Sequence, residues 1–141
     1  MANYNCAIRT NYFRVNNNEE FEKFINHVVG EDMYVFDSQD KDGNKLYGFG
    51  CYGNIYGYRE DSDDYDEECD YDKFIDGLQK HLADNDAVII FEAGNEKLRY
   101  VVGSVTVITK DGVEYEDVTN LGLKMAKKML NDPEYKTQVD Y

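Results

Sequence analysis

Basic residues are scarce in this chain. Its 141 residues include 15 Lys and Arg against 29 Asp and Glu, which gives a formal net charge of −14 at pH 7. A protein that binds nucleic acid without sequence preference needs clustered Lys and Arg against the phosphates. Adhesion to an anionic membrane surface needs the same residues. We therefore expect neither direct nucleic-acid binding nor membrane attachment.

Cysteine and long apolar runs are also scarce. Cys6, Cys51 and Cys69 are widely spaced and form no Cys-x-x-Cys pair, so their spacing indicates neither a zinc site nor a thioredoxin-type site. The N-terminus has no apolar core of a signal peptide. The longest clear apolar run, 87–91, is far shorter than the ~20 residues that span a bilayer. We expect a reduced, cytoplasmic protein, in a bacterium or in the cytosol of a host that a mobile element enters.

Motifs of catalytic, cofactor and metal sites are missing as well. Residues 48–53 match G-x-G-x-x-G, but no helix is predicted after them to hold a pyrophosphate. A calcium loop that began at Asp40 would have the wrong residues at its glycine and glutamate positions. His27 and His81 have no catalytic partner at a known motif spacing. We predict a non-enzymatic protein without cofactor or metal, with a small enzyme lacking a recognisable motif as an alternative.

What is present is the pattern of an α+β domain. The apolar periodicity predicts helices over about 19–29, 71–82 and 119–130, and strands over 4–15, 33–36, 46–52, 55–58, 87–91, 98–109 and 113–116. The order is β-α-β-β-(β)-α-β-β-β-α, and Asp-Gly pairs at 42–43 and 111–112 indicate hairpins. We therefore expect one domain over 1–132, with a mostly antiparallel sheet, helices packed on one face, and a frayed tail over 133–141.

Caps and glycines give the expected boundaries. Asn17 or Asn18 begins the first helix, and Gly30 ends it in the left-handed conformation. Gly94-Asn95 turns the chain between two strands. The first strand is expected to alternate faces throughout, with the even-numbered positions 6–12 on one face and the odd-numbered positions 7–15, Phe13 among them, on the other. The last helix presents an apolar stripe of Leu121, Met125 and Met129.

The strongest anomaly is the acidic segment 60–72. It has nine acids in thirteen residues and no base, and without it the chain would have a net charge of only −5. Such a run repels itself and stays solvated. Three interpretations are open: a flexible loop that maintains solubility, a loop that binds a divalent cation through carboxylate oxygens, or a surface that docks on a basic partner.

Tyrosine favours the docking interpretation. The chain has 13 tyrosines, and tyrosine supplies rigid apolar area with a polar tip at protein interfaces. Several lie beside the acids, although high strand propensity explains many of the others. The predicted partner-binding residues are Tyr56, Tyr58, Glu60, Asp61, Asp63, Asp64, Tyr65, Asp66, Glu67, Glu68, Asp70, Tyr71 and Asp72.

The acidic run 60–72, the small α+β pattern and the lack of catalytic motifs together resemble the small acidic inhibitors of bacterial phages and conjugative elements, of the anti-restriction and anti-CRISPR type. The resemblance implies a DNA mimic that blocks the basic cleft of a nuclease or another nucleic-acid-binding protein. Fully extended, the run spans about 43 Å and carries about one charge per 4.8 Å, against about one per 3.4 Å on a DNA strand. Alone it is too sparse to copy a duplex. Further acids, such as Asp76, Asp84 and Asp86, or a second copy in a homodimer would have to contribute.

Overall fold

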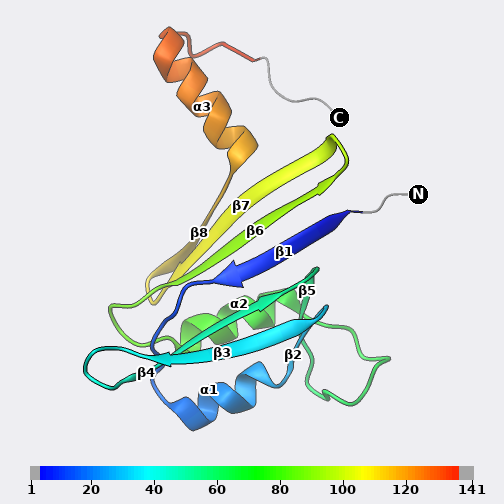
Figure 1. Ribbon diagram of the computed structural model, residues 1–141, viewed down its shortest axis with the longest axis vertical. Coiled ribbons are helices and arrows are strands. Elements are labelled where there is room, and N and C mark those ends of the chain that lie inside the picture. Colours follow the sequence, from blue (N-terminus) through cyan, green and yellow to red (C-terminus); the bar gives the residue numbers. More distant parts are fainter. Residues whose placement is uncertain (1–3, 137–141) are drawn as a thin grey trace.

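The computed structural model describes residues 4–136, which form an α+β domain with a mostly antiparallel sheet (Figure 1). The main sheet has the strand order β3-β4-β1-β6-β7-β8, and β2 and β5 form a separate pair. The expected tail includes residues 137–141, which lie outside the described residues. The elements are β1 (Asn5–Thr10), α1 (Asn18–Ile25), β2 (Val28–Gly30), β3 (Met33–Gln39), β4 (Lys45–Cys51), β5 (Ile55–Tyr58), α2 (Tyr71–His81), β6 (Val88–Glu96), β7 (Arg99–Thr109), β8 (Gly112–Asp117) and α3 (Val118–Leu130).

The core lies between the sheet and the helices α1 and α2. Phe13 stands edge-on to both Phe21 and Phe49, with ring centroids 5.7 and 6.3 Å apart. Each fully buried side chain of this size stabilises the fold by about 1.5–3 kcal/mol, so these aromatic residues account for much of the packing energy. The large side chains with the least exposure are Phe13, Phe21, Phe49, Phe74, Leu78, Leu82, Val88 and Ile108.

Helix α1 begins as expected and ends early. The side chain of Asn17 accepts a hydrogen bond from the backbone N–H of Glu20 at 3.0 Å, which confirms the N-cap. The helix ends at Ile25, and Val28–Gly30 pair with β5 instead. The prediction that Gly30 ends the helix was therefore wrong. The β-branched residues before Gly30 fit a strand better than a last helical turn.

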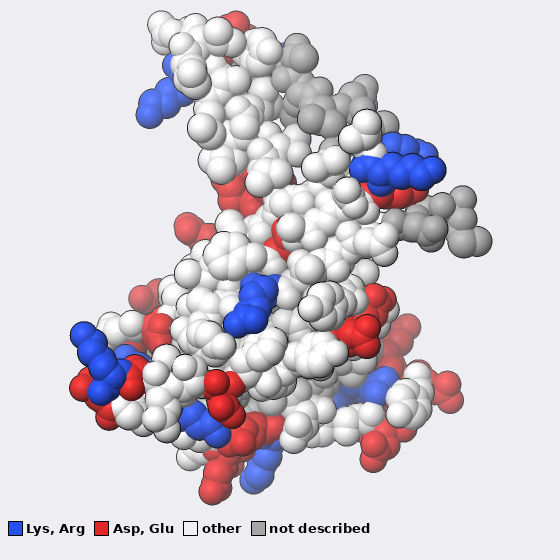
Figure 2. Space-filling view, in the orientation of Figure 1, with Lys and Arg blue, Asp and Glu red and all other residues white. Residues whose placement is uncertain are grey.

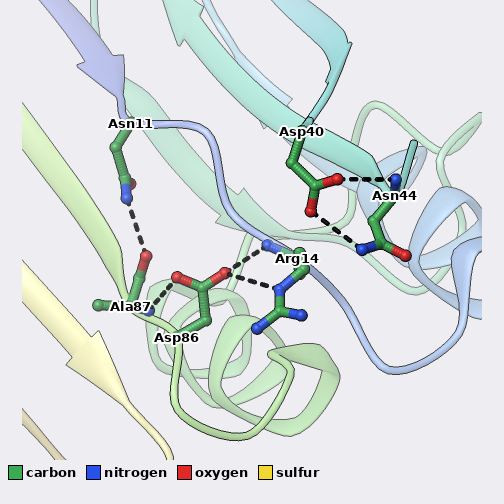
Figure 3. A network of polar contacts seen from close by, with 6 residues as sticks. All are labelled: Asn11, Arg14, Asp40, Asn44, Asp86 and Ala87. Carbon is green, nitrogen blue, oxygen red and sulfur yellow. Dashed lines mark hydrogen bonds and ion pairs between the residues drawn. The ribbon is translucent and has the colours of Figure 1, made fainter. Parts of the chain in front are cut away.

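The alternation of the first strand breaks at Asn11. Its side-chain amide donates to the carbonyl of Ala87 at 3.0 Å (Figure 3), and its side-chain oxygen accepts from the backbone N–H of Ile89 at 2.8 Å. The Asn11 side chain thus makes hydrogen bonds to the backbone of β6 and the residue before it that a strand backbone would otherwise make. The faces exchange after this point, so Phe13 is buried and Tyr12 is exposed, and the predicted alternation up to position 15 was wrong.

Two aspartates form hydrogen bonds close to the segment where the faces exchange (Figure 3). Asp86 accepts from the backbone N–H of Arg14 at 2.7 Å and lies 3.9 Å from the Arg14 Nε. Asp40 accepts from the backbone and side-chain amides of Asn44, and these hydrogen bonds hold the pKa of the Asp40 carboxyl below its usual value. Gly43 has a φ of 83°, so the predicted Asp-Gly hairpin is confirmed.

The β6–β7 hairpin turns later than expected. Gly94 and Asn95 lie within β6, and the turn falls at Lys97 and Leu98 instead. A Cβ at Gly94 would lie 2.5 Å from the carbonyl oxygen of Asn5 on β1. The glycine therefore permits close strand approach rather than a turn.

Helix α3 does not join the other two helices. It follows β8 directly and projects away from the body of the domain (Figure 1). None of the α3 residues is buried, and its first turn meets the sheet at Gly103, where an added Cβ would lie 3.0 Å from Val118. The expectation that the helices share one face holds for α1 and α2 and was wrong for α3.

Candidate functional site

The acidic segment forms a loop between β5 and α2 that projects from the side of the domain (Figure 1). Two backbone hydrogen bonds between Tyr58 and Asp70, at 2.9 and 2.7 Å, close the base of this loop. Gly57 precedes this closure with a φ of 131°. The two ends of the loop are therefore held together by β-type pairing.

Arg59 holds the loop from inside. Its side chain is only 7% exposed, and its Nη2 donates to the carbonyl of Ser62 at 2.7 Å. The guanidinium also lies 5.2 Å from the ring centroid of Tyr65. The Arg59 Nε has no hydrogen-bond partner within residues 4–136. Sequence reasoning missed this residue, because Arg59 lies one position before the acidic run.

Five of the nine carboxylates serve the structure of the loop itself. Glu67 accepts from the backbone N–H groups of Glu60 and Asp61 at 3.2 and 3.0 Å. Asp70 accepts from the backbone N–H of Lys73 at 3.1 Å and caps α2. The five structural carboxylates are Glu60, Asp61, Asp64, Glu67 and Asp70.

The other four carboxylates make no such contact. Asp63, Asp66, Glu68 and Asp72 are exposed, and no residue of the described chain forms a hydrogen bond or ion pair with their side chains. We call these four the free carboxylates. Acidic side chains gather around this side of the domain (Figure 2). The loop therefore presents uncompensated negative charge on a backbone that other carboxylates hold in shape.

The predicted tyrosines do not all reach the surface to the same extent. Tyr65, within the loop, is 85% exposed, and Tyr56 and Tyr71 are about half exposed. The Tyr56 hydroxyl donates to the carboxylate of Glu31. Tyr58 is only partly exposed, and its ring stacks on Phe24 with centroids 5.6 Å apart. Of the four, Tyr65 is the most exposed, and it lies in the sequence between the free carboxylates Asp63 and Asp66.

Residues 4–136 contain neither a cluster of side chains that could bind a metal ion nor a helix that could span a membrane. Within this range no group of three or more His, Cys, Asp and Glu side chains is placed to hold a metal ion. No helix in the range is long and apolar enough to cross a membrane. The three cysteines are unpaired thiols.

The two histidines line one hollow of about 360 Å³ between α1 and α2. The Nδ1 of His27 lies 3.0 Å from the carbonyl oxygen of Arg59. The ring of His81 lies 5.1 Å from that of Phe24. Both histidines are partly buried. Their spacing of 54 positions in the sequence gave no sign of this proximity, and the enzyme alternative stays a prediction.

The titration of His81 is a testable consequence of this packing. Burial lowers its pKa below the ordinary 6.5, and the charges of Lys80 and Lys110 act in the same direction. The folded state thus favours the neutral ring, so the stability that His81 contributes is present above pH 6.5 and is lost as the pH falls through its lowered pKa. We expect an NMR midpoint below 6.5. A His81→Gln variant should lose less stability than the wild type between about pH 7 and 5. A midpoint at or above 6.5 would contradict this packing.

A scan against protein-family models found no match, and searches of curated proteins and of solved structures found no match either.

Proposed function

We propose that this is a non-enzymatic interaction protein whose acidic loop binds a basic, nucleic-acid-binding surface of a partner. The observation that carries the proposal is the division of the loop into structural carboxylates and four free carboxylates, Asp63, Asp66, Glu68 and Asp72. On this proposal the protein is an inhibitor of the anti-CRISPR or anti-restriction type, and its free carboxylates stand in for DNA phosphates. The partner is a nuclease or another protein that binds nucleic acid.

The internal order of the loop supports docking over simple solubility. Charge alone suffices to keep a protein soluble, and a flexible run would supply it. Here Arg59 and Glu67 fix the backbone from within, so less conformational freedom is lost when a partner binds. The excess of negative charge would also accelerate encounter with a basic surface.

A matched pair of variants tests the proposal. The first neutralises the free carboxylates as D63N/D66N/E68Q/D72N. The second neutralises four exposed acids that lie outside the acidic segment and make no side-chain hydrogen bond or ion pair with the described residues, as E19Q/D32N/D37N/D111N. Both change the net charge by the same amount, so they separate the position of the charge from its total. Circular dichroism melts establish that each variant is folded.

We expect the first variant to bind a partner retained from a bacterial lysate about 10-fold more slowly at low salt, with a flatter dependence on salt. The second variant should behave as the wild type does. Association rates measured by surface plasmon resonance compare the two variants with the wild type. Equal rates for both variants would contradict a docking role and favour the solubility interpretation.

A further inference from the structure

Helix α3 carries large apolar side chains that are largely exposed. Val118, Leu121, Met125 and Met129 recur every three or four residues and form one stripe, which we call the α3 stripe. Met125 is 55% exposed and Met129 is 83% exposed, and no residue of α3 is buried. Monomeric proteins rarely leave such a continuous apolar surface open unless it mediates an interaction.

A second apolar surface lies on the face of the sheet that α1 and α2 do not cover. The register pairs Phe91 with Val105 and Ile89 with Val107 on neighbouring strands, and Phe91 is 51% exposed. We call these four residues the sheet strip. In the space-filling view, the surface over α3 and the adjoining strands is mostly uncharged (Figure 2).

A hollow of about 420 Å³ lies at the edge of this strip and has an acidic rim. Val105 and Val107 line it together with Glu114 and Glu116 of β8, which the register places directly beside the two valines. Glu116 is bound to Lys124 of the same chain at 2.7 Å. Glu114 has no ion pair within residues 4–136. A partner for this surface must therefore be apolar on one side and basic at its margin.

Helix α3 has that chemistry, because it contains three lysines and no acid. Within one chain, α3 does not pack on the sheet strip. Val118 follows the end of β8 without a loop, and the helix then leads away from the sheet (Figure 1). The α3 of a second copy has no such constraint. Lys128 lies at the margin of the α3 stripe and forms no ion pair with described residues, so it would then lie near the partner's Glu114.

We infer that the chain forms a homodimer in which α3 of each copy packs its stripe on the sheet strip of the other. Such an exchange is reciprocal, as two-fold symmetry requires, and it covers both exposed surfaces at once. A helix of this length is about 20 Å long and 10 Å wide. Each contact covers about 200 Å² on each copy, so two contacts bury roughly 800 Å² in total, which is the size of a weak, concentration-dependent interface. The acidic loop takes no part in this interface. An experiment that contradicts the dimer therefore leaves the proposed docking function standing, and the reverse also holds.

Sedimentation equilibrium of the full chain between about 1 and 100 µM tests the dimer. The wild type should approach twice the chain mass of 16.4 kDa. Met125→Glu should raise the dissociation constant about 30-fold or more, as loss of a central interface residue does. Val35→Glu is the matched control, because Val35 is 49% exposed on β3 at the opposite edge of the sheet. A wild type that stays monomeric throughout, or equal effects of the two substitutions, would overturn the inference.

Charge reversal tests the helix-on-sheet arrangement itself. Lys128→Glu should weaken the dimer, and adding Glu114→Lys to the same chain should restore it, because each contact then has opposite charges again. Failure to restore the dimer would overturn the reciprocal arrangement. So would a monomeric wild type whose α3 stripe binds a different protein. Thermal melts of each variant show whether the monomer fold is intact.

Discussion

Replacing Gly57 by alanine should lower the free energy of unfolding by about 3–5 kcal/mol. Gly57 has a φ of 131°, which L-residues with a side chain rarely adopt. An added Cβ would also lie 2.6 Å from the carbonyl carbon of Asp70 and 2.7 Å from the backbone nitrogen of Tyr71. These are backbone atoms at the start of α2, so they cannot rotate out of the way. The substitution must displace either β5 or the closed base of the acidic loop.

Gly43→Ala is the matched control for this effect. Gly43 also has a positive φ, 83°, but no atom lies within 4 Å of its added Cβ. It should cost about 1 kcal/mol, from the backbone conformation alone. Urea unfolding of both variants gives the comparison. If Gly57→Ala costs no more than Gly43→Ala, the close approach of β5 to Asp70 is not a constraint on the fold.

Replacing Arg59 by methionine should destabilise the domain by about 2–3 kcal/mol, because hydrogen bonds from charged groups are the stronger class. The variant loses the hydrogen bond to Ser62 and the contact with the Tyr65 ring. It also removes a buried positive charge at the base of the acidic loop. We expect the loop to lose its fixed shape while the core around Phe49 stays packed.

Hydrogen exchange of the backbone amides in 60–69 measures this effect. Exchange there should accelerate in Arg59→Met, while amides of β1 and β6 keep their protection. Arg59→Lys keeps the charge but loses the planar donor geometry, so it should give an intermediate result. Unchanged loop exchange in Arg59→Met would show that Arg59 does not organise the loop.

Local signals in the sequence predicted much of the fold. The Asp-Gly pair at 42–43 specifies a hairpin because glycine accepts a positive φ, and Asn17 was one of two asparagines expected to begin α1. The end of α1 was not predictable in the same way. Residues 28–29 continue the helical apolar spacing and also suit a buried strand, so periodicity alone does not separate the two.

The remaining differences arise from contacts between distant segments. The break at Asn11 depends on hydrogen bonds to residues 87–89, which no local pattern contains. The role of Arg59 depends on a loop that folds back over it. The stripe of α3 was recognised from its spacing, but amphipathicity does not say what covers the apolar side, and the chain's own core does not cover it.

The most direct test of the central claim is competition between DNA and the acidic loop for the same partner. Immobilised wild-type protein is exposed to a bacterial lysate at low salt, and the retained proteins are challenged with double-stranded DNA. We predict that retained proteins bind nucleic acid, that DNA or high salt releases them, and that D63N/D66N/E68Q/D72N fails to retain them. Retention that is indifferent to DNA and equal for this variant and the wild type would contradict the account.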